Sequence, residues 1–372
     1  MIPITRLSVG EGEALAAAEA VRSGWLTCGK RVEKFESLVA QYVGAKYGIA
    51  VNSCTTALHL ALIAAGVRQG DEVICPSFSF IATANAIVYA GAKPVFVDID
   101  PTTYNISADL IEPAITSRTK AILPVSQIGL AADIPAIMRI ARKRGLTVIE
   151  DAAPSLGAAI GDDRIGSLSD FTCFSFDARK ILTTGEGGMI MTDDGAVAER
   201  LFGMRAHCAS VSTIARHTSS GVVLEGYPEL GYNYKLTDIQ GAVGIVQMSR
   251  LEEILTERRR LADRYQLLLA DEKGLGLPHE PPVYRHVFQS YCVRLKTGKT
   301  QLHVMSEIAA REIATRRIIA IHLEPPYRAL YPDLELPETE RATKETLLLP
   351  LFVGMSDSEQ DQVVQALRQA LA

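Results

Sequence analysis

Long apolar runs, clustered cysteines and an excess of charge of one sign are all missing from this sequence. No uninterrupted apolar stretch reaches the roughly 18 residues of a membrane-spanning helix, and residues 1–6 lack the pattern of a secretory signal. The six cysteines are far apart and form no CxxC pair, which argues against a disulfide framework and a zinc site. Lysine and arginine number 38 against 43 aspartate and glutamate residues, so no basic surface for nucleic acid is indicated. We therefore expect a cytoplasmic protein without membrane, metal or nucleic-acid contacts.

An alternation of short and long apolar segments is present instead. Between about residues 45 and 195, β-branched runs alternate with longer apolar or amphipathic stretches, which is typical of the α/β class. Strands are predicted at 71–75, 94–99, 121–125 and 146–149. The segment 55–65 is apolar almost all round and ends at Gly66, which predicts a buried helix. Asp133 is a candidate cap for the helix that follows it.

The pattern changes after about residue 250. Thr237 and Gln240 have the spacing of a capping box and predict a helix to about Met248. A second, amphipathic helix starts at Leu251, and another capping box, Ser356 with Glu359, precedes a final helix. A chain of 372 residues is long enough for about two domains. We expect a large domain over 1–250, including the N-terminal segment, and a smaller α+β domain over 251–372.

One lysine stands out within the run from 174 to 189, where hydroxyls, aromatics and closely spaced glycines surround Lys180. It follows an apolar and aromatic segment, and partial burial lowers the pKa of a lysine toward the range useful for Schiff-base chemistry. The alternative is a solvated surface lysine beside an ordinary glycine turn.

Two further groups of polar residues lie at the ends of predicted strands. Asp151 ends the strand that begins near Leu146, and ligands of open α/β sheets bind at the carboxyl ends of strands. A helix-capping aspartate is the alternative interpretation. The segment 52–57 places Ser53, Thr55 and Thr56 at the start of the buried helix, where free N–H groups form a ready anion site. Simple capping by Ser53 or Thr55 accounts for only one of these hydroxyls.

With these motifs in order, the sequence resembles the DegT/DnrJ/EryC1/StrS family of sugar aminotransferases, which are pyridoxal-phosphate enzymes of fold type I. The resemblance covers nearly the whole chain. Its strongest pieces are 52–62, 70–83, 91–100, 150–153, 174–189, 231–233 and 237–240. It implies a large domain with a mixed, mostly parallel sheet and a smaller α+β C-terminal domain.

The resemblance also implies a role for each matching residue. Lys180 would bind pyridoxal 5′-phosphate covalently and shuttle the proton, and Asp151 would pair with the ring nitrogen and keep it protonated. Phe80 would stack on the ring. Thr55, Thr56 and Ser175 would hold the phosphate. Asn233 would reach the phosphate of the neighbouring subunit, which implies a homodimer with shared active sites.

Some positions depart from the family pattern. Pro154 stands where many members have a glutamine that contacts the hydroxyl of the cofactor ring. Lys235 stands where arginine is common, and the two cations are not equivalent in binding carboxylates.

The leading functional hypothesis is transfer of an amino group from glutamate or glutamine to a keto-sugar, specifically a nucleotide-linked keto-deoxy sugar, in amino-sugar biosynthesis. A cyclitol ketone is the alternative acceptor. A non-catalytic binding or regulatory protein on the same fold is the alternative from another class, and Pro154 is its only support. Conversion of the cofactor to its pyridoxamine form by an amino donor separates an enzyme from a binding protein.

Overall fold

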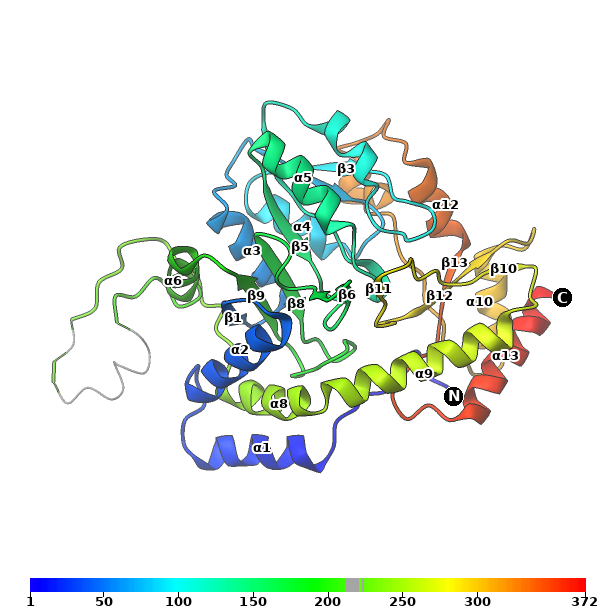
Figure 1. The fold of residues 1–372 in the computed structure, drawn as a ribbon, viewed down its shortest axis with the longest axis horizontal. Helices are drawn as coiled ribbons and strands as arrows, with labels where there is room; N and C mark the ends of the chain where they lie inside the picture. The colour runs from blue at the N-terminus through cyan, green and yellow to red at the C-terminus, as the bar shows by residue number, and fades with distance from the viewer. Residues whose placement is uncertain (212–220, 223) are drawn as a thin grey trace.

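A seven-stranded sheet organises the larger part of the chain (Figure 1). The computed structural model describes residues 1–211, 221, 222 and 224–372. In sheet order the strands are β1 (Tyr47–Val51), β9 (Gly188–Thr192), β8 (Phe171–Ser175), β5 (Thr147–Asp151), β4 (Thr119–Ile122), β2 (Glu72–Pro76) and β3 (Lys93–Val97). Only β9 runs antiparallel to its neighbours β1 and β8, and the other pairs are parallel. The predicted α/β class with a mixed, mostly parallel sheet is confirmed.

Helices cover both faces of this sheet, because its strands are apolar on both sides. On one face lie α3 (Cys54–Ala64), α4 (Ala82–Tyr89) and α6 (Gly195–Met204), whose apolar side chains pack with Ile49 and Ile149. On the other face α2 (Lys30–Val43) and α5 (Ile134–Arg144) pack with Ala50 and Val148. Near-continuous burial of this kind is expected of parallel strands with helices on both faces. The predicted helix 55–65 corresponds to α3, and Asp133 caps α5 as expected.

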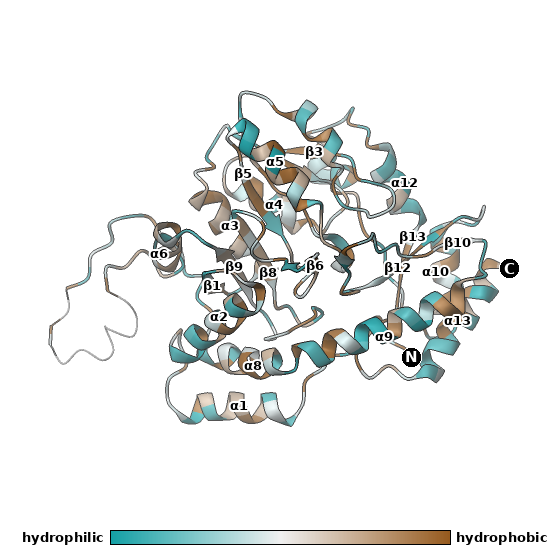
Figure 2. Ribbon diagram, in the orientation of Figure 1, coloured by the Kyte–Doolittle hydropathy of each residue, from teal (hydrophilic) through white to brown (hydrophobic). Residues whose placement is uncertain are grey.

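A second, three-stranded antiparallel sheet lies in the C-terminal part. Its strands are β10 (Leu275–Gly276), β12 (Tyr291–Leu295) and β13 (Thr346–Leu349). It shares an apolar cluster with α9 (Leu251–Leu269), α10 (Gln301–Ala309) and α13 (Asp357–Leu371). Teal and brown segments along α9 in Figure 2 fit a helix with one buried stripe. We propose that residues 251–372 form the smaller domain.

The remaining helices and strands include a third, three-stranded sheet. They are α1 (Glu11–Arg22), β6 (Ala159–Ile160), β7 (Asp163–Arg164), α8 (Asp238–Ser249), β11 (Tyr284–Arg285), α11 (Pro325–Arg328), α12 (Pro337–Glu345) and short 3-10 turns. Ile2 joins the C-terminal apolar cluster, so the N-terminal segment reaches the smaller sheet. Asp98, just after β3, accepts hydrogen bonds from the backbone N–H groups of Glu338 and Thr339 at 2.9 and 2.8 Å. The larger sheet and α12 are therefore tied together. Among the described residues, no helix is both long and apolar enough to cross a bilayer.

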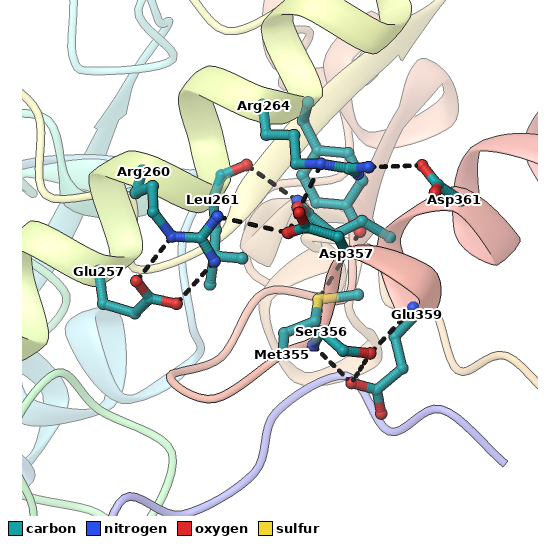
Figure 3. A network of polar contacts seen from close by, with 11 residues as sticks. Glu257, Arg260, Leu261, Arg264, Met355, Ser356, Asp357, Glu359 and Asp361 are labelled. Carbon is teal, nitrogen blue, oxygen red and sulfur yellow. Dashed lines mark hydrogen bonds and ion pairs between the residues drawn. The ribbon is translucent and has the colours of Figure 1, made fainter.

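The start of α13 is fastened to α9 by polar contacts (Figure 3). Arg260 and Arg264 of α9 pair with Asp357 and Asp361 at 3.4 and 2.8 Å. Arg260, Asp357 and Asp361 are exposed and Arg264 is partly buried, and surface ion pairs contribute only about 0–1 kcal/mol each. The predicted capping box of Ser356 and Glu359 is present. The apolar stripe of α9, rather than these charges, accounts for most of the attachment.

The capping box at the start of α8 gives a first prediction. The Thr237 hydroxyl accepts a hydrogen bond from the Gln240 N–H, and the Gln240 side chain accepts one from the Thr237 N–H. We expect Thr237→Ala to lower the free energy of unfolding by about 1 kcal/mol, measured by urea titration. Thr237→Ser keeps the hydroxyl and should stay close to the unsubstituted protein. Equal stability of the alanine variant would show that the box contributes nothing.

Candidate active site

A cavity of about 430 Å³ opens at the carboxyl ends of the central strands. Asp151 ends β5 and Ser175 ends β8, while Thr55 lies at the start of α3 after β1. Lys180 and Phe80 complete this part of the wall. The cavity lies where open α/β sheets bind ligands. Five of the residues predicted from sequence thus line one space.

The Asp151 carboxylate is buried and held at both oxygens. Its Oδ2 accepts a hydrogen bond from the Thr83 hydroxyl at 2.8 Å, and its Oδ1 accepts one from the Ala153 N–H at 3.2 Å. Burial raises the pKa of Asp151, while these hydrogen bonds and the charge of Lys180 oppose the rise. Burial and these hydrogen bonds therefore act in opposite directions on the charge of Asp151, and the carboxyl faces the cavity.

Lys180 lies in the turn after β8, where its N–H bonds to the Asp177 carbonyl at 2.9 Å. Burial lowers the pKa of Lys180, and the negative charge of Asp151 works against that change. A lysine with a lowered pKa has a larger neutral fraction, and neutral Nζ is the form that attacks carbonyl carbon. The interpretation of Lys180 as an ordinary surface lysine does not fit this environment.

The start of α3 forms the opposite wall. Ser53 is the cap, and its hydroxyl accepts a hydrogen bond from the Thr56 N–H at 3.2 Å. Helix geometry leaves the N–H groups of Cys54 and Thr55 with no preceding carbonyl to bond, and both residues line the cavity. A Cβ on Gly188 of β9 would lie 2.5 Å from the Ser53 carbonyl, so only glycine allows this close approach. Gly188 pairs with Ser175 of β8, so its lack of a side chain allows the start of α3 to lie beside Ser175.

Two of the predicted residues, both in the described part of the chain, lie outside this cavity wall. The Thr56 hydroxyl oxygen lies 2.8 Å from both Asn52 Oδ1 and the Ser53 carbonyl oxygen, which share its single hydrogen, and so this hydroxyl is used at the start of the helix. Asn233 is exposed and accepts a hydrogen bond from Lys235. It pairs by a β-bridge with Ala206, which lies two residues after the end of α6.

Other residues that line the cavity are not among the site residues predicted from the sequence. Gln127, Gln289 and Arg316 line the cavity, and the last two come from the C-terminal part of the chain. The Gln289 amide donates to the Arg179 carbonyl at 2.7 Å, and Arg179 itself pairs with Asp177 at 3.2 Å. Only the packing of the C-terminal part against the larger sheet brings Gln289 and Arg316 to the site, so no local pattern could have identified these two residues. Pro154 also lines the cavity and has no side-chain donor to offer.

The side chains present fit pyridoxal 5′-phosphate. The α3 start and Ser175 offer N–H and hydroxyl donors to a phosphate. Asp151 offers a carboxylate to a protonated ring nitrogen, and Lys180 offers an amine to the aldehyde. Phe80, with 70% of its surface exposed, offers an apolar face at the cavity.

A second buried carboxyl, Glu150, gives a pH prediction. Burial raises the pKa of Glu150 to about 7, despite hydrogen bonds from Ser126 and Thr172. The folded state then binds more protons than the unfolded state between about pH 5 and pH 7, so stability falls as the pH rises through that window. The slope is at most about 1.4 kcal/mol per pH unit.

We expect Glu150→Gln to remove this part of the fall, because a neutral amide does not titrate. The measurement is urea unfolding at about pH 5.5 and about pH 8 for both proteins. The same pH dependence in the variant and the unsubstituted protein would assign the fall to other groups.

Comparisons with known proteins agree with this geometry. A family model described as the DegT/DnrJ/EryC1/StrS aminotransferase family matches residues 8–368. The chain is 40% identical over 358 residues to the GDP-perosamine synthase of Caulobacter vibrioides, covering 95% of this chain and 94% of that one. It is 38% identical over 374 residues to the spore coat polysaccharide biosynthesis protein SpsC of Bacillus subtilis, covering 99% and 96%. Among solved structures, Spr1654 from Streptococcus pneumoniae in its PMP form gives a TM-score of 0.93 at 27% identity, over 100% of this chain and 99% of that one.

Proposed function

Because this chain belongs to the DegT/DnrJ/EryC1/StrS aminotransferase family, we propose that it transfers an amino group from glutamate or glutamine to a nucleotide-linked keto-deoxy sugar in amino-sugar biosynthesis. The family, the fold type and the cofactor expected from the sequence are confirmed: the chain is an aminotransferase that uses pyridoxal 5′-phosphate. A role in binding without catalysis is therefore not retained.

One observation carries the proposal: Lys180, Asp151 and the start of α3 line a single cavity. When bound, pyridoxal phosphate supplies an aldehyde that takes up the amino group and a ring that withdraws electrons. Lys180 would hold the cofactor and then accept and return a proton at Nζ, which its lowered pKa favours. Asp151 would keep the ring nitrogen protonated. Thr55 and Ser175 would hold the phosphate, and Phe80 would cover one face of the ring.

The sugar acceptor is supported by the relatives rather than by a motif. One is named for a GDP-linked amino sugar and another for polysaccharide biosynthesis. The chain presents Arg316 and Arg179 at the same cavity as Lys180, and guanidinium groups suit the phosphates of a nucleotide-linked substrate.

The test is an acceptor panel with ¹⁵N-labelled glutamate or glutamine, followed by mass spectrometry of the product. We expect label in nucleotide-linked keto-sugars and not in free keto-sugars or cyclitol ketones. Efficient labelling of a cyclitol ketone, with none in the nucleotide sugars, would replace the proposed acceptor with the alternative one.

We also propose a homodimer in which Asn233 of one subunit serves the cavity of the other. Asn233 is exposed and lies outside the cavity wall of its own chain, which supports this arrangement. Ultracentrifugation tests the dimer, and mixing Lys180→Ala with Asn233→Ala protein tests the sharing. In a mixed dimer one cavity would have both native residues, so part of the activity should return. No recovery from subunits that demonstrably exchange would contradict sharing.

A further inference from the structure

Two hydroxyl side chains connect the Asp151 carboxylate to the loop that presents Phe80. Thr83 lies in the first turn of α4 and is fully buried, and Ser79 is 2% exposed. The Ser79 and Thr83 hydroxyl oxygens are 2.9 Å apart, and the Thr83 hydroxyl is 2.8 Å from Asp151 Oδ2. Ser79 lines the cavity, whereas Thr83 stands behind the wall. Thr83 therefore acts on a ligand only through Asp151.

The direction of these hydrogen bonds follows from counting hydrogens. A carboxylate only accepts, so the single hydroxyl hydrogen of Thr83 goes to Asp151. Thr83 has none left for Ser79, so the Ser79 hydroxyl is the donor in that pair. The hydrogen bonds are therefore donated in series, from Ser79 to Thr83 and from Thr83 to Asp151.

The strength of the hydrogen bond between Thr83 and Asp151 depends on the charge of Asp151. A protonated Asp151 could still accept at Oδ2, but a neutral carboxyl oxygen accepts a hydrogen bond more weakly than a carboxylate oxygen does. The hydrogen bond from Thr83 therefore stabilises the charged form and lowers the pKa of Asp151. The opposing influence is burial, which favours the neutral carboxyl and raises the pKa of Asp151.

The backbone around these hydroxyls is also fixed. The Ser79 N–H bonds to the Ser77 carbonyl at 3.0 Å, and the Thr83 N–H bonds to the Phe80 carbonyl at 3.1 Å. Phe80 lies between the two hydroxyl residues, so the same short segment places the aromatic face and orients the carboxylate.

We propose that Thr83, supported by Ser79, is a positioning residue that holds Asp151 as an anion facing the cavity, and so sets how fully the cofactor ring nitrogen is protonated. This rests on the proposed function, in which Asp151 meets that nitrogen. Loss of one hydrogen bond to a charged group corresponds to a rate decrease of about tenfold or somewhat more.

The experiment compares Thr83→Val, which has nearly the same shape but no hydroxyl, with Thr83→Ser, which keeps the hydroxyl. Each protein is loaded with pyridoxal phosphate labelled with ¹⁵N in the ring, and the nitrogen chemical shift is followed by NMR across pH. The charged and titratable groups near Asp151 stay unchanged in these variants: Lys180, Cys54, Cys173 and Glu150.

In Thr83→Val we expect the nitrogen signal to move toward the unprotonated position and conversion by the amino donor to slow about tenfold, with little change in KM. Thr83→Ser should restore both readouts. Ser79→Ala should move them in the same direction by less, and it keeps the test available if the valine variant folds poorly. Wild-type nitrogen shifts in both Thr83→Val and Ser79→Ala would overturn the proposal.

Measurements on the unsubstituted protein distinguish a failure of this inference from a failure of the proposed function. If that protein did not bind pyridoxal phosphate, both the proposed function and the role of Thr83 would be contradicted. A native protein that binds and converts the cofactor, beside variants with unchanged nitrogen shifts, would remove the role of Thr83 alone.

Discussion

Replacing Lys180 with alanine is expected to lower the rate of amino transfer by about 10⁴-fold or more. In the proposed function Lys180 is both the covalent anchor and the group that moves the proton, and no other lysine of the described residues lines this cavity to replace it. Single-turnover conversion of the bound cofactor by glutamate measures the loss directly, without dependence on the acceptor.

A second lysine of the larger part of the chain provides a matched control for Lys180→Ala. Lys120 of β4 is exposed, and Lys120→Ala should convert the cofactor at nearly the native rate. Circular dichroism should show both variants folded. Conversion by Lys180→Ala at a rate close to that of the control would contradict the assignment of Lys180.

Replacing Asp151 with asparagine is expected to slow the same conversion by about 10²- to 10³-fold. The substitution keeps the size of the side chain and removes the negative charge that, in the proposed function, keeps the ring nitrogen protonated. Because Asp151 is only 5% exposed, water cannot easily replace that charge. Stopped-flow absorbance measures the rate.

Glu150→Gln is the control for this second prediction. Glu150 is adjacent in sequence, and successive side chains of a strand point to opposite faces. Its oxygens bond to Ser126 and Thr172 rather than to the cavity. We expect that variant to keep most of the native rate. An Asp151→Asn protein as fast as Glu150→Gln would show that the charge of Asp151 does not matter.

The common location of Thr55, Asp151 and Lys180 at one cavity could be expected from the sequence, because each residue belongs to a local pattern. Asp151 ends a buried strand, Lys180 follows an aromatic strand and precedes glycines, and Thr55 begins an apolar helix. In a parallel sheet, strand ends meet at one edge, so such patterns imply proximity. The strand limits differ by a few residues, since β5 extends to Asp151 and β4 ends at Ile122.

Thr56 shows the limit of that reasoning. The sequence predicts an anion site from the neighbouring hydroxyls of Ser53, Thr55 and Thr56 at a helix start. In the structure, Ser53 and Thr56 bond to each other in a capping box. Local hydrogen bonds to the backbone compete for hydroxyl groups at helix starts. The sequence does not reveal which hydroxyl remains available, and the structure leaves Thr55 at the cavity.

Residues brought in by tertiary packing could not be predicted at all. Arg316 and Gln289 come from the C-terminal part of the chain, and Thr83 is 68 positions before Asp151 in sequence. A threonine in the first turn of an apolar helix has no feature that marks it as a partner for a distant carboxylate. The proposed role of Thr83 follows only from the hydrogen bonds that link Ser79, Thr83 and Asp151 in the folded structure.

The most direct test of the account is the absorbance spectrum of the purified protein before and after glutamate, then glutamine, with no sugar present. We expect the band of bound pyridoxal phosphate to give way to that of the pyridoxamine form, with release of the matching keto acid. A band that persists with both donors would contradict the proposed donors and the assigned roles of Lys180 and Asp151.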